Sequence, residues 1–193
     1  MTSRRDTTTT MRLVRFIQVG LATALLGACA ALPDDAPIVE KLDTETGTTV
    51  TRLGRPVEIY RETFLQETAG RFAFIGPFET NLMGRRELYV WLAVPIEPMA
   101  DAVPVVEVNG AVLPLGTPGR SADYANVHES PYKIPTPWSA MYYFKVDETV
   151  IARLGEATDV NVRVVEAGKN GPIKALFAVK IAEDPRLRDF ATR

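Results

Sequence analysis

The residues that could carry out acid–base or nucleophilic chemistry lie close together in one segment, residues 116–139. Asp123, His128 and Ser130 have the side-chain types of a hydrolase triad, in which a base activates a serine oxygen. No Gly-x-Ser-x-Gly sequence surrounds Ser130, and these polar residue types are common in loops. His128 is the only histidine, which excludes zinc sites built from several histidines. The sequence therefore favours a non-catalytic protein, and we assign no catalytic residue, metal ligand or cofactor.

The same segment combines a restricted backbone with aromatic side chains, as binding surfaces often do. Its four prolines lower the entropy that is lost when the segment becomes ordered. Large aromatic side chains give contact area with few rotatable bonds. We therefore expect a partner to contact Tyr124, His128, Tyr132 and Trp138. Two alternatives remain: the segment covers an open sheet edge, or it is the lid of a small-molecule carrier or hydrolase.

The single cysteine, Cys29, follows a segment with the features of a secretory signal. Arg12 and Arg15 supply positive charge, and thirteen uncharged, mainly apolar residues at positions 16–28 lead to the cysteine. A helix of that length rises about 20 Å, less than the ~30 Å hydrocarbon core of a bilayer. The segment therefore indicates export of the chain and not a permanent membrane span.

The residues around the cysteine also carry a resemblance to a known class of protein. Leu26, Gly27, Ala28 and Cys29 resemble the lipobox of bacterial lipoproteins, an aliphatic residue and two small residues before a cysteine that becomes lipidated. The resemblance covers residues 1–30 only. It implies a signal peptide cleaved before Cys29, diacylglycerol on the thiol and a fatty acid such as palmitate on the new amine.

The residue after the cysteine bears on where such a lipoprotein would be held. Ala30 stands where an aspartate would favour the inner membrane, so the resemblance implies a lipid anchor in the outer membrane, facing the periplasm. Translation could begin at Met1 or at Met11, because Met11 directly precedes the first charged residue of a compact signal.

The charge balance of the remaining chain limits its partners. The leader holds four of the 22 basic and one of the 24 acidic residues, so residues 29–193 have a net charge of −5. A mildly acidic chain without a basic cluster is a poor nucleic-acid binder. Membrane attachment would then depend on the acyl chains on Cys29 and not on charge. The partners that we expect are the membrane, through this anchor, and an envelope protein or polymer.

From residue 48 onward, apolar and polar residues alternate with the period of two that is typical of β-strands. Residues 88–94 are apolar at every position, which indicates a strand that is covered on both faces. Asn109 and Gly110 separate two apolar runs and predict a hairpin with a type I′ turn. Asp147 predicts the start of a short helix that ends at Gly155.

These patterns predict an all-β fold, an immunoglobulin-like antiparallel β-sandwich with one short helix, and a small β-barrel is the alternative. The globular part resembles no specific domain family. We expect a signal peptide at 1–28, a flexible tether at 29–47, the sandwich at 48–182 and a charged tail at 183–193. Part of the tether could instead pair along a sheet edge, and the tail could form a further short helix. The expected function is that of a periplasmic binding or structural module.

Overall fold

A computed structural model of the chain describes residues 37–61, 72–94, 102–133, 139–166, 173–180 and 184–193. The strands are β1 (Ile38–Asp43), β2 (Thr48–Leu53), β3 (Val57–Arg61), β4 (Phe72–Leu82), β5 (Arg85–Val94), β6 (Ala102–Val108), β7 (Ala111–Val112), β8 (Ala140–Val146), β9 (Asp159–Glu166) and β10 (Ile173–Lys180). The helices are the 3-10 helix η1 (Ala122–Ala125) and the α-helices α2 (Glu148–Gly155) and α3 (Pro185–Ala191). All strand pairs are antiparallel, which confirms the predicted all-β fold.

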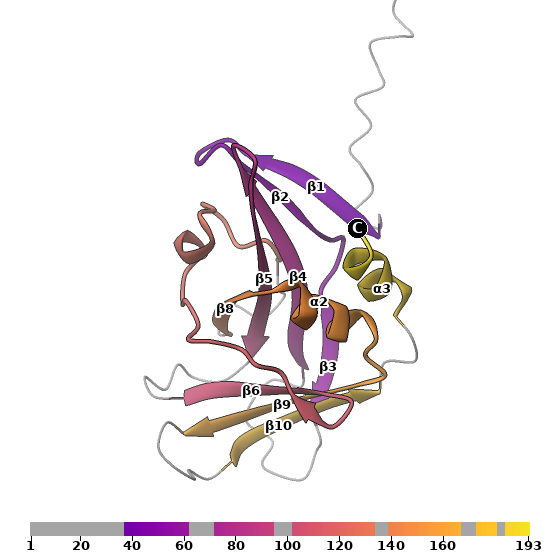
Figure 1. Cartoon of the computed structure of the whole chain (residues 1–193). Coiled ribbons are helices and arrows are strands. Elements are labelled where there is room, and N and C mark those ends of the chain that lie inside the picture. The colour runs from indigo at the N-terminus through magenta and orange to yellow at the C-terminus, as the bar shows by residue number, and fades with distance from the viewer. Residues whose placement is uncertain (1–36, 62–71, 95–101, 134–138, 167–172, 181–183) are drawn as a thin grey trace, which may run out of the picture. The chain divides into compact units, whose positions relative to one another are not determined.

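The long strand β4 joins two layers of sheet, because the two halves of one of its edges pair with different strands. Residues 78–81 of β4 pair with β2, and residues 72–75 pair with β3. The first layer has the order β8–β5–β4–β2–β1, and the second continues from β3 through β10, β9 and β6 to β7. Figure 1 shows β6, β9 and β10 crossing below β4 and β5. The arrangement is an open, sandwich-like fold and not a closed barrel.

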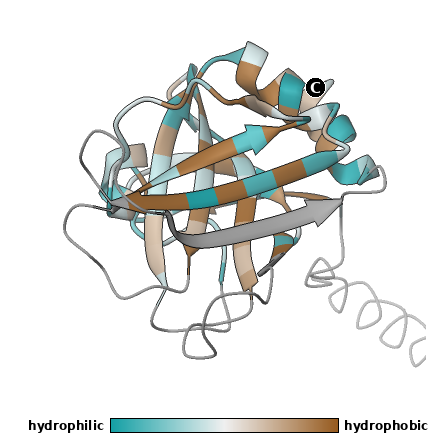
Figure 2. Cartoon of the chain, turned by 90° about the horizontal axis from the view of Figure 1, so that it is seen from below, coloured by the Kyte–Doolittle hydropathy of each residue, from teal (hydrophilic) through white to brown (hydrophobic). Residues whose placement is uncertain are grey.

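The first layer is covered on both of its faces. In β5, Val90, Leu92 and Val94 point to one face, and Tyr89, Trp91 and Ala93 point to the other. All six side chains are at most 1% exposed, as the apolar pattern of this strand predicts. In the second layer, apolar and polar residues alternate along β6 and β9 (Figure 2), and buried residues alternate there with more exposed ones.

The segment after β7 covers one face of the first layer. The Tyr132 ring packs where a Cβ on Gly76 of β4 would lie, and it stands 5.1 Å from the Trp91 ring, centroid to centroid. Gly119 also exchanges two backbone hydrogen bonds with Tyr143, of 2.8 and 3.0 Å, and thereby pairs with the outer edge of β8. The described part of the segment is therefore an ordered cover over the sheet, as one of the alternatives supposed.

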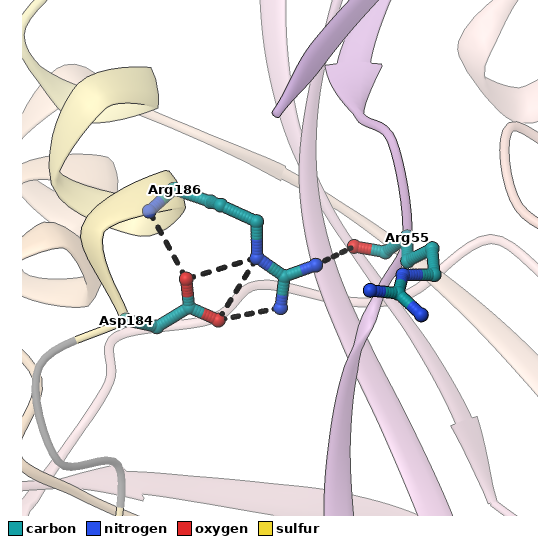
Figure 3. Close-up of polar contacts among 3 residues, drawn as sticks. All are labelled: Arg55, Asp184 and Arg186. Atoms are coloured by element: carbon teal, nitrogen blue, oxygen red, sulfur yellow. Dashed lines mark hydrogen bonds and ion pairs between the residues drawn. The ribbon is translucent and has the colours of Figure 1, made fainter. Parts of the chain in front are cut away.

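The two α-helices begin at aspartates. The Asp147 side chain accepts a hydrogen bond from the Val150 N–H (3.1 Å), as predicted for the start of α2. Asp184 does the same for α3 by accepting from the Arg186 N–H at 3.0 Å. Figure 3 shows the Arg186 guanidinium between the Asp184 carboxylate and the Arg55 carbonyl, which ties α3 to the connection between β2 and β3.

Both ends of the globular unit differ from the predicted boundaries. Residues 38–43, expected in the flexible tether, form β1 along the edge of β2, which was the alternative for this segment. Residues 185–191 of the predicted charged tail form α3, the short helix that the sequence allowed there, and α3 buries Leu187 and Phe190. The described residues thus belong to one unit, Asp35–Arg193, that begins before and ends after the predicted domain. Among the helices that the structure describes, none is long and apolar enough to span a bilayer.

Candidate binding groove

A groove of about 290 Å³ lies between the β1–β2 hairpin and residues 128–133. Its lining includes Lys41, Asp43 and Glu45 from the hairpin and His128, Glu129 and Lys133 from the segment that covers the sheet. Val50 and Pro131 supply apolar surface. We refer to this feature as the groove. Its two walls are more than seventy residues apart in the sequence, and only the fold brings them together.

Hydrogen bonds from the β1–β2 hairpin hold the opposite wall in place. The His128 backbone N–H donates to Asp43 Oδ2 at 2.6 Å, and the Thr48 hydroxyl donates to the Asn126 carbonyl at 2.9 Å. The N–H groups of Glu45 and Thr46 approach the other Asp43 oxygen at 3.1 and 3.4 Å. These donors, the His128 N–H first among them, lower the pKa of the Asp43 carboxyl. Asp43 therefore stays ionised while it joins the two walls.

The charges in the groove are mixed. Lys41, Arg52 and Lys133 are cationic, and Asp43, Glu45 and Glu129 are anionic. Lys41 Nζ and Glu129 Oε2, each about 70% exposed, are 3.9 Å apart across the groove. Balanced charge suits a ligand with alternating donors and acceptors, such as an extended peptide or a polar polymer, better than a polyanion.

Arg52, one of the cationic residues that line the groove, also stabilises the fold. Arg52 Nη1 donates to the carbonyls of Leu53 and Gly54, each at 2.8 Å. Its guanidinium carbon lies 5.6 Å from the centroid of the Tyr132 ring. Arg52 therefore stabilises the end of β2 while part of its side chain faces the groove.

Tyr132 is the main correction to the expected contact residues. Its side chain is 2% exposed, its hydroxyl donates to the Pro77 carbonyl, and the Leu53 N–H donates to the same hydroxyl at 3.2 Å. Burial raises the pKa of this hydroxyl. Tyr132 fastens the covering segment to β2 and β4 and is not available to a partner.

The other expected contact residues are dispersed. His128 is exposed at the wall of the groove, whereas Tyr124 is 44% exposed outside the groove lining, where its ring meets Tyr89 edge-on at 6.3 Å. Trp138 and Cys29 lie outside the described residues. Of the expected contact residues that the structure describes, only His128 lines the groove.

The polar residues that resemble a triad are not assembled for catalysis. Ser130 Oγ is buried and has no hydrogen-bond partner among the described residues, so no base is in place to activate it. Its neighbour is the Tyr143 hydroxyl, whose interactions with Ser130 and Trp91 partly offset the rise in pKa that burial causes. Within the described ranges, no three histidine, cysteine, aspartate or glutamate side chains gather where they could hold a metal ion.

The sequence interpretation missed most of the groove. Lys41, Asp43 and Glu45 were expected in a flexible tether, since acidic residues near prolines favour disorder. The sequence did contain a weak signal for the β1–β2 hairpin. Ile38 and Val39 form a short apolar run, and a possible turn at residues 43–47 separates this run from the apolar residues of β2. No family model, curated protein or solved structure matches the chain.

Proposed function

We propose that this chain is a lipoprotein of the bacterial cell envelope, anchored through Cys29 and exposed to the periplasm from the outer membrane. Its β-domain acts as a non-catalytic module that binds a protein segment or an envelope polymer in the groove. The observation that carries the anchoring is the Leu26–Cys29 sequence behind an apolar leader. The groove supplies the binding surface, and the unassembled triad residues favour binding over hydrolysis.

Two features support binding in the groove. Its wall is held by hydrogen bonds to Asp43 and Thr48, so a ligand would meet a surface that is already ordered. The remaining polar groups, including the Lys133 and Glu129 side chains, are exposed and can pair with a ligand. A rigid rim with exposed charges is typical of surfaces that gain specificity from complementary charge.

Mass spectrometry of the mature N-terminus tests the anchor. The full chain is expressed in a bacterium that processes lipoproteins and is purified from its membranes. We expect a chain that begins at Cys29 and carries a diacylglycerol and a fatty acid. The Cys29→Ala variant should keep its leader and lack lipid. A mature chain that begins at any other residue would contradict the anchor.

Site-specific cross-linking in cells tests the groove. A photoreactive residue at position 133 is compared with one at Val112, which is 53% exposed on β7 and outside the groove lining. We expect a discrete adduct from position 133 only. A Glu129→Lys change, which reverses the charge on the facing wall, should reduce the adduct at least several-fold without changing the urea midpoint. Equal yields from both positions would contradict binding in the groove.

A further inference from the structure

The walls of the groove are joined at both of its ends. At the turn of the β1–β2 hairpin, the His128 N–H donates to Asp43 Oδ2 at 2.6 Å. At the other end of β2, the Leu53 N–H donates to the Tyr132 hydroxyl at 3.2 Å. Residues 128–132 therefore run alongside β2 in the direction of the strand, because Asp43 pairs with Thr48 at the start of β2. The groove follows β2 and has two distinct ends.

Acidic side chains lie at one end of the groove and basic side chains at the other. Asp43 and Glu45 belong to the hairpin turn. The Arg52 guanidinium carbon is 5.6 Å from the centroid of the Tyr132 ring, and Lys133 follows Tyr132 in the chain. Arg52 is four residues beyond the β2 partner of Asp43, so the two ends are roughly 13 Å apart along the strand. The balanced charge of the groove is thus separated into two ends of opposite sign.

One charge at each end has no ion-pair partner among the described residues. Neither Glu45 nor Lys133 forms an ion pair within that part of the chain, and both side chains are exposed. Asp43 and Arg52 keep their charges while they bind backbone groups of the fold. A ligand therefore meets an uncompensated negative charge at one end of the groove and an uncompensated positive charge at the other.

The middle of the groove is neutral and partly apolar. Lys41 and Glu129 face each other across it at 3.9 Å, so their charges balance. Val50, the β2 partner of Lys41, supplies apolar surface at the same level of the strand. Because an ion pair between exposed side chains contributes little to stability, a ligand can separate Lys41 from Glu129 at a small cost.

We propose that the groove binds an extended peptide segment that carries one basic and one acidic side chain four residues apart. The basic side chain lies beside Asp43 and Glu45, the acidic side chain lies beside Arg52 and Lys133, and the residues between them are uncharged. In an extended chain, side chains four residues apart point to the same side and are about 13 Å apart, which matches the two ends of the groove. The inference rests on the proposed binding function and specifies its ligand.

The separation of charge favours a peptide over a polymer whose charges have one sign. A polyanion would be attracted to the basic end and repelled by the acidic end, so the two effects oppose each other. A peptide provides both signs at a fixed spacing, with uncharged residues between them. The hydrogen bonds at Asp43 and Tyr132 hold the walls before binding, so the ligand does not have to order them.

A set of three synthetic peptides tests the proposal. Each is capped, has two charged side chains four positions apart and is otherwise uncharged: one carries lysine and aspartate, one carries two lysines and one carries two aspartates. Their affinity for the full mature chain in detergent micelles is measured by fluorescence anisotropy. We expect the mixed peptide to bind at least about fivefold more tightly than the others, because each of those places like charges together at one end. A mixed peptide with its charges two positions apart should lose this advantage.

Two charge reversals should change this preference selectively. Lys133→Glu cancels the charge of the basic end, so the two-lysine peptide should bind as well as the mixed peptide while the two-aspartate peptide stays weak. Glu45→Lys should have the converse effect at the acidic end. Arg193→Glu and Asp189→Lys make the same changes in net charge at exposed positions outside the groove lining, and both should keep the preference for the mixed peptide. Urea midpoints should not change, because all four side chains are exposed.

The other outcomes overturn the proposal. Equal affinities for the three peptides, no binding of any of them, or the same response in the groove variants and the controls would show that the groove does not recognise separated charges. Binding of polygalacturonate in place of the peptides would assign the groove to an anionic polymer. A groove variant that changes the oligomeric state in light scattering would assign the groove to a second copy of the chain.

The proposed function is tested separately by the cross-link in cells. Without a discrete adduct from position 133, binding in the groove fails as a whole. A discrete adduct together with any of the overturning results contradicts only the peptide ligand.

Discussion

At the scale of single residues, the core contains two buried polar atoms without a well-formed hydrogen bond. Trp91 is fully buried, and neither its Nε1 nor the Ser130 Oγ has a well-formed hydrogen bond among the described residues, although both interact with the nearby Tyr143 hydroxyl. The value of Trp91 to the fold therefore comes from its ring, which packs against Tyr132.

Two substitutions of Trp91 separate the ring from its N–H group. Trp91→Ala should lower the free energy of unfolding by about 3–5 kcal/mol, because it leaves a large cavity. Trp91→Phe should cost much less, because it keeps an aromatic ring and removes an unpaired donor. Urea unfolding monitored by circular dichroism measures both. Equal costs for the two variants would show that the N–H group contributes to stability after all.

Glu87 should make the stability of the domain depend on pH in the acid range, because three donors surround its carboxylate. Lys145 Nζ lies at 2.8 Å, the Tyr89 hydroxyl at 2.6 Å and Arg85 Nη2 at 2.6 Å. The bond from Lys145 contributes most, and together these contacts lower the pKa of Glu87 from 4.5 to about 2. Burial, together with this carboxylate, raises the pKa of the Tyr89 hydroxyl.

The pH dependence follows from the direction of this shift. Because the folded-state pKa of Glu87 is below its unfolded value, its contribution is fully present above about pH 4.5 and is lost as the pH falls toward 2. In Glu87→Gln, the free energy of unfolding should fall less over this interval, so the two proteins converge at low pH. Urea midpoints measured across the range test this, and parallel pH profiles would contradict it.

At the scale of elements, the covering segment has one buried tyrosine, Tyr132, and one exposed tyrosine, Tyr124. The Tyr132 hydroxyl satisfies two backbone groups beneath it, whereas the Tyr124 hydroxyl donates to the Thr117 carbonyl at 3.3 Å near the surface. The two residues therefore allow the same substitution to be compared in two environments.

Tyr132→Phe should destabilise the domain by about 1–3 kcal/mol, because it leaves the Pro77 carbonyl and the Leu53 N–H without their partner. Tyr124→Phe should change the free energy of unfolding by less than about 0.5 kcal/mol. Thermal unfolding compares the variants directly. A larger loss in Tyr124→Phe would show that the outer part of the segment, not Tyr132, fastens it to the sheet.

The elements that the sequence predicts well are those specified by nearby residues. The two-sided strand β5, the Asn109–Gly110 turn and the Asp147 cap of α2 each follow from a few adjacent side chains. β1 was predicted only as an alternative to a flexible tether, because its exposed side chains show little alternation and its pairing with β2 supplies the order. The groove, and the pairing of one β4 edge with both β2 and β3, depend on contacts between segments that are distant in the sequence. A local sequence pattern does not encode such contacts.

At the scale of the whole molecule, α3 closes the unit from the C-terminal end. It packs against α2 and β2, and Leu187 and Phe190 are 3% and 6% exposed. At Gly155 of α2 a Cβ would stand 2.5 Å from the Ala191 Cβ, which shows how closely the two helices approach.

Removal of α3 should therefore affect the whole domain. A chain that ends at residue 183 should lose more than about 3 kcal/mol of stability, because two large apolar side chains leave the core. A chain that lacks only Arg193 should unfold like the full chain. Urea unfolding of the two truncated chains tests this. Equal midpoints would contradict the role assigned to α3 and return residues 184–193 to the charged tail predicted from the sequence.

The pairing of β3 with β10 has a consequence for the order in which the protein is made. β3 is complete at residue 61, but its partner in the second layer ends at residue 180, and β6 likewise waits for β9. Contacts across so many residues form slowly, since the intervening chain must first close. If the chain is exported from its N-terminus, β1, β2, β4 and β5 can pair early, while β3 remains without β10, and β6 without β9, until synthesis is nearly finished. Between the synthesis of β3 and that of β10, the unpaired edges of β3 and β6 can bind wrong partners, so this is when the chain has most need of a chaperone.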